Sequence, residues 1–336
     1  MQWKRARAKW QALAGVALGL LFIFLAFRRV DLRQMLRALG GADYVLLLPV
    51  LAVVVLGLLL RSLRWKFLLA PIGEASTASL FASLNIGYMA NTALPAHLGE
   101  ILRAWHAGRK NGISAGSVFA TVVIERMLDV LSLLLLLALA LLVFPFPSWV
   151  RHSGALMLFL VVAAGLLLAW MKKNKDRALA LCGRLRRILP HSASAFVGKM
   201  LEQFLRGVAP LKRRSHYPAV AFLSILIWAS YALILQLLFH AFDFVHAYRL
   251  PWSAALVAMV ITTISVVVPS SPGYVGSFHL LCQLSLGLFA VPRGPALSYA
   301  FVLHAVSVFP PFFLGLFFLA RDRISLRSLR KAEIHA

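Results

Sequence analysis

The segment "VVVPSSPGYVGSFHLL", residues 266–281, lies between long apolar runs and yet contains two prolines, two glycines and three serines. Proline removes a backbone donor and disfavours helix at the preceding residue, and glycine permits backbone angles that other residues resist. The segment therefore predicts a break in an apolar helix. Inside a membrane, peptide groups freed by such a break must be buried in protein or line a cavity.

The surrounding composition is that of a membrane protein. Hydrophobic residues make up 61% of the 336 positions and charged residues only 14%. Apolar runs approach the roughly 20 residues that a helix needs to cross a bilayer core; they cover 13–27, 44–60, 78–94, 127–144, 154–171, 218–240, 254–291 and 296–319. We expect an all-α polytopic membrane protein with about six full transmembrane helices and two re-entrant broken helices.

The charges indicate which side of the membrane each loop faces. The formal net charge is +24, which in a soluble protein would suggest nucleic acid; in a membrane protein, basic residues mark the cytoplasmic side instead. They gather in 1–10, 172–217 and 321–336. We expect a multi-pass protein of the bacterial cytoplasmic (inner) membrane, with both termini cytoplasmic and membrane lipids, not nucleic acid, as partners. The loop 28–43 is an exception to this rule, because it holds four arginines although the alternation of spans places it outside.

The order of the runs divides the chain into a first membrane repeat, 1–150, with a re-entrant element at 78–104, and a second, 151–336, with one at 254–291. Each half has three crossings, so the second is inverted relative to the first. A shift of 177 positions lays "PAHLGE", which starts at 95, over "PGYVGS", which starts at 272. Inverted repeats with broken helices near the midplane are a common plan of secondary transporters.

The basic loop 172–217 contains an amphipathic pattern, with hydrophobic residues at helical spacing over 196–208. This pattern indicates either an interfacial helix on an anionic inner leaflet or a helix packed against the protein's own inner surface.

The first broken element reads "NIGYMANTALPAHLGEILRAW", residues 85–105. After its proline the sequence has the form of a helix start, which aims backbone N–H groups and a partial positive charge at a bound anion such as phosphate. Five residues around this break are candidates for a substrate site or pathway: Asn91, Pro95, His97, Glu100 and Arg103.

Three charged residues follow inside the next apolar stretch. Glu125 and Asp129 share a helical face, with Arg126 beside them. Each ionised group costs roughly 3 kcal/mol at the centre of a membrane helix, so burial would call for pairing with Arg103 or Arg126. The alternative is that the crossing covers only 127–146 and that the three charges lie at the inner interface.

A third basic group, "RSLRWKFLL" (61–69), follows the second apolar run. Arg61 and Arg64 are typical of topology anchors and Trp65 of an interface aromatic; contact of either arginine with a lipid headgroup is the alternative.

Other functional signals are weak. His240, His246 and His304 have no ligand-like spacing, and lone histidines in apolar runs usually bind a neighbouring helix. We therefore expect no metal and no cofactor. Phosphate-loop, HExxH and nucleophile-elbow motifs are absent from the sequence, so we do not expect an enzyme.

The second break supplies candidates of its own. Its prolines would stop an inbound half-helix, its glycines would allow the turn, and its polar side chains would meet freed peptide groups or a headgroup. These candidates are Pro272, Gly273, Tyr274, Gly276 and His279. We expect this break and the first one to enter from opposite faces and to form one two-sided site.

Four stretches, "RSLRWKFLL", "GYMANTALPAHLGEILRAW", "GISAGSVFATVVIERMLDVL" and "PSSPGYVGSFH", resemble in order the lysylphosphatidylglycerol synthase transmembrane family, also called flippase-like, over most of 44–320. In its multiple peptide resistance factors, the membrane unit is joined to a synthase domain and is held to move the product lipid between leaflets. The resemblance implies lipid translocation and argues against lipid aminoacylation here. The family usually has arginine where this sequence has His97, so a phosphate contact there would be lost or pH-dependent.

We thus expect a translocase that moves a phospholipid or a polyprenyl-phosphate-linked lipid between the leaflets. One alternative is an intramembrane transferase on a lipid-linked substrate, with Glu100, Glu125 or Asp129 as general base. Another is a membrane partner of a separate lipid synthase or glycosyltransferase.

Overall fold

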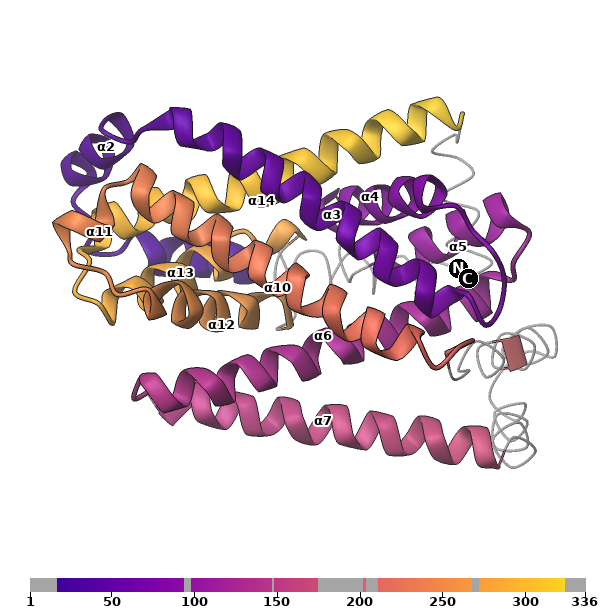
Figure 1. The fold of residues 1–336 in the computed structure, drawn as a ribbon. Helices are drawn as coiled ribbons and strands as arrows, with labels where there is room; N and C mark the ends of the chain where they lie inside the picture. The colour runs from indigo at the N-terminus through magenta and orange to yellow at the C-terminus, as the bar shows by residue number, and fades with distance from the viewer. Residues whose placement is uncertain are drawn as a thin grey trace.

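The computed structural model describes residues 17–93, 98–146, 148–174, 202–203, 211–267 and 272–323, and the regular elements within them are helices (Figure 1). The first half contains helix Ala17–Phe27, α2 (Leu32–Gly40), η1 (Tyr44–Leu46), α3 (Leu47–Leu69), α4 (Thr77–Ala93), α5 (Leu98–Asn111) and α6 (Ala115–Val143). The second contains α7 (Ser148–Lys173), α10 (His216–Ala241), α11 (Phe244–Ala247), α12 (Ser253–Val267), η3 (Pro272–Tyr274), α13 (Ser277–Gly287) and α14 (Arg293–Arg321).

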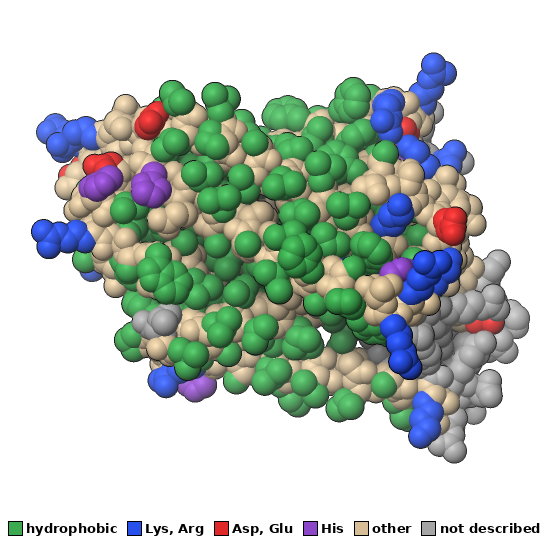
Figure 2. Space-filling model, viewed as in Figure 1, with side chains coloured by type: hydrophobic (Ala, Val, Ile, Leu, Met, Phe, Trp, Pro, Cys, Tyr) green, Lys and Arg blue, Asp and Glu red, His purple; other side chains and the backbone are tan. Residues whose placement is uncertain are grey.

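The molecule is an all-α polytopic membrane protein, as its composition predicts. Four helices of the described part are long and apolar enough to cross a membrane: Tyr44–Leu69, Arg151–Met171, His216–Ala241 and Arg293–Arg321. Large hydrophobic side chains such as Leu48 and Phe159 remain exposed on such helices. Figure 2 shows these side chains over the middle of one face and the charged ones mainly at its two ends. This distribution suits a protein whose middle is surrounded by lipid tails.

The two ends are defined by contacts between distant segments. At the α2 end, the Asp43 amide donates to the Ala241 carbonyl at 2.8 Å, and Gly294 lies against the backbone of α2. At the α5 end, Lys212 Nζ lies 3.7 Å from Glu74 Oε1, so the start of α10 meets the α3–α4 loop. The described basic residues just before α10, such as Lys212, and at the end of α14, such as Arg321, therefore share the α5 end, whereas the arginines of the loop 28–43 lie at the α2 end.

Two helical hairpins enter from these opposite ends (Figure 1). α4 and α5 contact each other and lie toward the α5 end, while α12 and α13 contact each other and lie toward the α2 end. The positions between α4 and α5, 94–97, and between α12 and η3, 268–271, are outside the described residues. Of the three prolines expected to break the helices, Pro95 and Pro269 lie in these intervals, as does His97, whereas Pro272 begins η3.

The two sequence halves pack tightly on each other. α10 packs along α3, and α14 packs along α4. A Cβ added to Gly315 of α14 would come within 2.5 Å of the Asn85 carbonyl oxygen and of Met89 Cβ, so only glycine allows this approach. The halves therefore share one core, and their division at 150 stays a prediction. The amphipathic pattern over 196–208 also stays a prediction, because only its residues 202–203 are described.

A polar contact holds the α5 end together. Asp322, the residue that follows α14, accepts from Lys110 Nζ at 2.6 Å and lies 3.1 Å from His106 Nε2, both on α5. His106 Nδ1 is 2.7 Å from Ser83 Oγ of α4. Partial burial opposes ionisation of Asp322, but hydrogen bonds from Lys110 and Arg321 outweigh it and hold the pKa of its carboxyl below the ordinary value.

Candidate functional site

Seven charged side chains from three helices meet in the interior, and we call them the buried charge cluster. Its residues are Arg61 and Arg64 of α3, Glu100 and Arg103 of α5, and Glu125, Arg126 and Asp129 of α6. Asp129 is the central residue of α6, with 14 helical residues on either side. The structure thus places Glu125, Arg126 and Asp129 near the middle of a 29-residue helix, while their depth in the membrane stays a prediction.

The two α3 arginines bind the α6 carboxylates. Arg61 Nη1 donates to Asp129 Oδ2 at 3.0 Å and to Glu125 Oε1 at 3.3 Å, and its Nε donates to the Tyr231 hydroxyl of α10 at 2.6 Å. Arg64 Nη2 donates to Asp129 Oδ1 at 2.5 Å, and its Nη1 donates to Ser224 Oγ at 3.1 Å. Both arginines are buried.

This finding corrects two interpretations of "RSLRWKFLL". The segment does not follow a span but continues α3, which ends at Leu69. Arg61 and Arg64 are therefore interior residues and not topology anchors. Trp65 is fully buried, so it is not an interface aromatic. The cost of burying these cations is offset by carboxylates more than 60 positions away, which no local pattern could indicate.

Arg103 connects the first hairpin to α6. Its Nη2 donates to Glu125 Oε2, and its Nε lies 3.5 Å from Glu100 Oε2 one helical turn earlier. The guanidinium carbon sits 4.4 Å from the centre of the Trp65 ring, and the Trp65 Nε1–H donates to Thr121 Oγ1 at 3.0 Å. A cation above an aromatic face gains electrostatic stabilisation, so Trp65 both orients and stabilises Arg103.

Arg126 is the member of the cluster that reaches the molecular surface. Its Nη2 lies 2.9 Å from Glu125 Oε1 and 3.4 Å from Asp129 Oδ2, and its Nη1 lies 4.0 Å from Glu100 Oε1. Its side chain is 35% exposed, whereas that of Glu125 is 0% exposed. Arg126 therefore marks the side from which the cluster can be approached.

The break of the first hairpin is held by Asn91 and Gly99. The Gly99 amide, in the first turn of α5, donates to Asn91 Oδ1 at 2.8 Å. A Cβ at Gly99 would overlap the Gly87 carbonyl oxygen, so the two helices of the hairpin touch through their backbones. This close approach directs the first turn of α5, with Glu100 and Arg103, toward α6.

The second break lies against the first. Gly273 is next to Thr92 of α4, and its φ of 65° favours glycine. Tyr274 lies within electrostatic range of Glu100 and Arg126. The structure thus brings together Asn91, Glu100 and Arg103 from one hairpin with Gly273 and Tyr274 from the other, beside α6. η3 begins at Pro272, while Gly276 and His279 lie further along, at the start of α13.

Several contacts of this region were missed by sequence reasoning. Tyr231 and Ser224 of α10 bind cluster residues, Thr121 of α6 binds Trp65, and His304 of α14 binds the second break. Single polar residues in apolar helices are too common for their partners to be inferred from spacing. A lone histidine in an apolar run was expected to bind a neighbouring segment. His304 does so, because its Nε2 donates to the Gly273 carbonyl at 2.7 Å.

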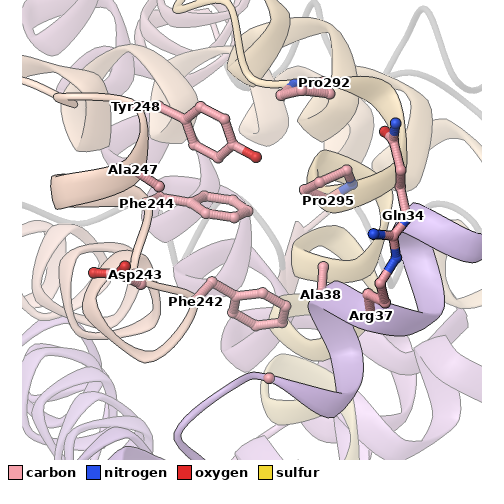
Figure 3. Close-up of a pocket in the computed structure, with 11 residues that line it drawn as sticks. Gln34, Arg37, Ala38, Phe242, Asp243, Phe244, Ala247, Tyr248, Pro292 and Pro295 are labelled. Atoms are coloured by element: carbon pink, nitrogen blue, oxygen red, sulfur yellow. The ribbon is translucent and has the colours of Figure 1, made fainter.

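A pocket of about 430 Å³ lies elsewhere, at the α2 end. Figure 3 shows Phe244 and Tyr248 on one side of it and Gln34 and Arg37 on the other. None of the residues predicted for the site lines this pocket. The buried charge cluster and this pocket are therefore separate sites. The function proposed below rests on the cluster.

Comparison with known proteins relates the chain to a family of membrane proteins. The model of the lysylphosphatidylglycerol synthase TM region matches residues 12–315. A UPF0104 membrane protein of Methanocaldococcus jannaschii is 25% identical, and the alignment covers 89% of this chain and 91% of that protein. A UPF0104 membrane protein of Methanothermobacter thermautotrophicus is 24% identical, and the alignment covers 90% of this chain and 91% of that protein. The glycosyltransferase AglD of Haloferax volcanii is 28% identical over 121 residues, which cover 36% of this chain and 19% of that protein. These relatives are archaeal, so a bacterial membrane stays a prediction.

Proposed function

The chain belongs to the family of the lysylphosphatidylglycerol synthase transmembrane region, and on that premise we propose that it moves lipids with an anionic headgroup between the two leaflets of its membrane. The observation that carries the proposal is the buried charge cluster. The headgroup would enter this cluster while the acyl chains stay among the exposed apolar side chains of the surrounding helices.

The charge balance of the cluster favours an anion. Four guanidinium groups face three carboxylates, which leaves a formal charge of +1 in a largely buried place. An uncompensated buried charge is costly unless it is paired. A phosphodiester or phosphate group would supply the missing negative charge, whereas a zwitterionic headgroup would bring a further cation with it.

The cluster also has unused donors. Arg103 Nη1, Arg64 Nε and Arg126 Nε are buried and have no hydrogen-bond partner among the described residues. Guanidinium N–H groups form short, strong hydrogen bonds to phosphate oxygens. Because each of these arginines already donates to a carboxylate through its Nη2, the side chains are held in place before a headgroup arrives.

The arrangement of the hairpins supports movement between the two sides. We propose that both are re-entrant and that they belong to an inverted repeat, since they approach from opposite ends and meet beside the cluster (Figure 1). In transporters of this plan, rocking of one repeat against the other exposes a fixed central site to each side in turn. The shared core means that such rocking would have to shift the α3–α10 and α4–α14 contacts.

A transferase is the less favoured function. A general base needs a carboxylate that can take up a proton, but Glu125 and Asp129 each contact three or four guanidinium groups. Such pairing favours the ionised form and restricts the side chain. We therefore propose a binding role for these carboxylates. A separate synthase or glycosyltransferase as partner would be compatible with it.

Purified protein in vesicles tests the proposal. Fluorescent phosphatidylglycerol, a polyprenyl phosphate and phosphatidylcholine would be followed with a membrane-impermeant quencher, together with mass spectrometry of the recovered lipid. We expect the anionic lipids to cross faster than in protein-free vesicles and to be recovered chemically unchanged. We expect Arg103→Gln to lose this activity and Arg249→Gln, at the α2 end, to keep it. Equal rates with and without protein would refute translocation, and a covalently altered lipid would favour the transferase.

A further inference from the structure

Two histidines face each other at the second break. The imidazole rings of His279 in α13 and His304 in α14 have centroids 4.8 Å apart, at an interplanar angle of 63°. His279 is 3% exposed, and His304 is partly buried. Phe301 lies 4.4 Å from His279 and Phe278 lies 5.1 Å from His304, both centroid to centroid, so the pair sits in an aromatic enclosure.

Hydrogen bonds identify which ring nitrogens carry protons. The Gly276 amide donates to His279 Nδ1 at 3.2 Å, so this nitrogen must present a lone pair. The Gly273 carbonyl can only accept, so His304 Nε2, at 2.7 Å, must carry a hydrogen. In the neutral pair, His279 therefore has its hydrogen on Nε2, which is buried and without a partner among the described residues.

A further proton would bind to His304 and not to His279. Protonation of His279 Nδ1 would set its N–H against the Gly276 N–H, at a turn where Gly276 has a φ of 94° and no room for a Cβ. Protonation of His304 Nδ1 instead leaves the bond to Gly273 in place and makes it charge-assisted, which strengthens it. Two positive imidazoles this close would repel, so the pair takes up one proton.

The surroundings leave His304 as the group whose charge can change. In the described part, α12 and the helix Ala17–Phe27, which pack against α13, have no ionisable side chains. Electrostatic interaction with His279 comes from His304. Other ionisable groups near the break are Cys282 of α13, Tyr299 of α14, Tyr88 of α4 and Tyr274 of η3. Tyr274 interacts electrostatically with Glu100 of α5 and Arg126 of α6 as well as with Tyr88.

We propose that His304, oriented by Gly273 and flanked by His279, is a proton-binding site that controls the turn of the second hairpin and couples lipid movement to a proton gradient. The coupling rests on the proposed function; the proton site does not. With a proton on Nδ1, His304 holds the Gly273 carbonyl firmly and ties the turn to α14. Release of the proton weakens this bond, and the turn, which lies against Thr92 of the first hairpin, becomes free to shift.

A proton gradient would supply the energy for lipid movement in place of nucleotide hydrolysis. The sequence contains no phosphate loop. Coupling ions of secondary transporters bind near broken helices at the midplane, and His304 binds the backbone at such a break.

The proton site is tested by NMR of histidine-¹⁵N-labelled protein in lipid nanodiscs between about pH 4 and about pH 8, the range in which a histidine can titrate. We expect a histidine that keeps its Nδ1 unprotonated throughout, assigned to His279 by its loss in His279→Gln. We expect a second one that gains a proton on Nδ1, assigned to His304 by its loss in His304→Gln. If the His304 signal stays neutral across this range, or if His279 gains the proton, the proposal is overturned.

Coupling is tested in the vesicles described above, with and without an imposed pH difference. We expect the gradient to accelerate wild-type translocation, and His304→Gln, whose amide can still donate to Gly273, to lose the gradient-dependent part while keeping the basal rate. His240→Gln, at an exposed position on α10, should behave as wild type. If the wild-type rate of translocation does not change with the gradient, coupling is refuted and the proposed function stands. If no translocation occurs at all, the proposed function is refuted, and the NMR result alone decides whether His304 binds a proton.

Discussion

Arg103 of α5 and Glu125 of α6 form a buried ion pair that joins the first hairpin to α6. Glu125 is shared, because Arg61, Arg64 and Arg126 also lie within ion-pair distance of it. Arg103 is further held by the face of Trp65. The pair is thus the centre of a network and not an isolated bridge.

Neutralising Glu125 should destabilise the protein strongly. Glu125→Gln leaves four arginines with two carboxylates, and loss of one partner from a buried pair typically costs about 3–5 kcal/mol. We expect a clear fall in the thermal unfolding midpoint of the protein in detergent. Glu74→Gln is the matched control, because Glu74 is exposed and contacts Lys212 only at 3.7 Å. A shift for Glu125→Gln no larger than that of the control would contradict the network.

Adding one methyl group to Gly99 should disrupt the first hairpin. In Gly99→Ala the new Cβ would overlap the Gly87 carbonyl oxygen and the Asn91 side chain, and such overpacking typically costs about 1–3 kcal/mol. Gly287→Ala in α13 meets nothing within 4 Å and should be neutral or slightly stabilising. Thermal unfolding of both variants checks this, and equal midpoints would show that α4 and α5 are not in backbone contact.

The ring of Trp65 should matter more than its N–H. Trp65→Phe keeps an aromatic face under Arg103 and loses only the hydrogen bond to Thr121, which typically contributes about 1 kcal/mol. Trp65→Leu loses both and frees the Arg103 guanidinium. In the vesicle assay we expect translocation to fall modestly for Trp65→Phe and severely for Trp65→Leu. The reverse order would mean that the N–H, and not the cation–π contact, positions Arg103.

The contact at the α5 end should make stability depend on pH at acidic values. The pKa of Asp322 is held below its ordinary value, so its stabilising contribution is complete above the unfolded-state pKa of about 3.9 and is lost as the pH falls through the folded-state pKa. We expect wild type to be more stable than Asp322→Asn at about pH 6, with the difference shrinking below about pH 4. A difference in unfolding midpoint that persists unchanged at low pH would argue against this contact.

Much of the architecture follows from local sequence. Long apolar runs predict the spanning helices, and the prolines at 95 and 269 fall between the helices of each hairpin, where the breaks were expected. The pairing of Arg103 with Glu125 could also be predicted, since an ionised residue deep in a membrane helix needs a partner. The re-entrant character of the hairpins and their inverted relation remain proposals.

The position of α3 in the network could not be predicted. Arg61 and Arg64 follow an apolar run, which is where topology anchors usually lie. Their interior position depends on Glu125 and Asp129, which become neighbours only when α3 and α6 pack. The role of His304 was missed for a similar reason: its partner is a backbone carbonyl 31 positions away, at a break whose geometry depends on two glycines.

The central claim is that an anionic headgroup enters the buried charge cluster, and photo-crosslinking tests it most directly. A phosphatidylglycerol analogue with a photoreactive headgroup would be added to the protein in nanodiscs, and the labelled peptides would be located by mass spectrometry. We predict labels on α3, α5 and α6 around Arg61, Arg103 and Glu125, removed by excess unlabelled phosphatidylglycerol but not by phosphatidylcholine. Labels confined to the pocket between α2 and α11, or equal competition by both lipids, would contradict the claim.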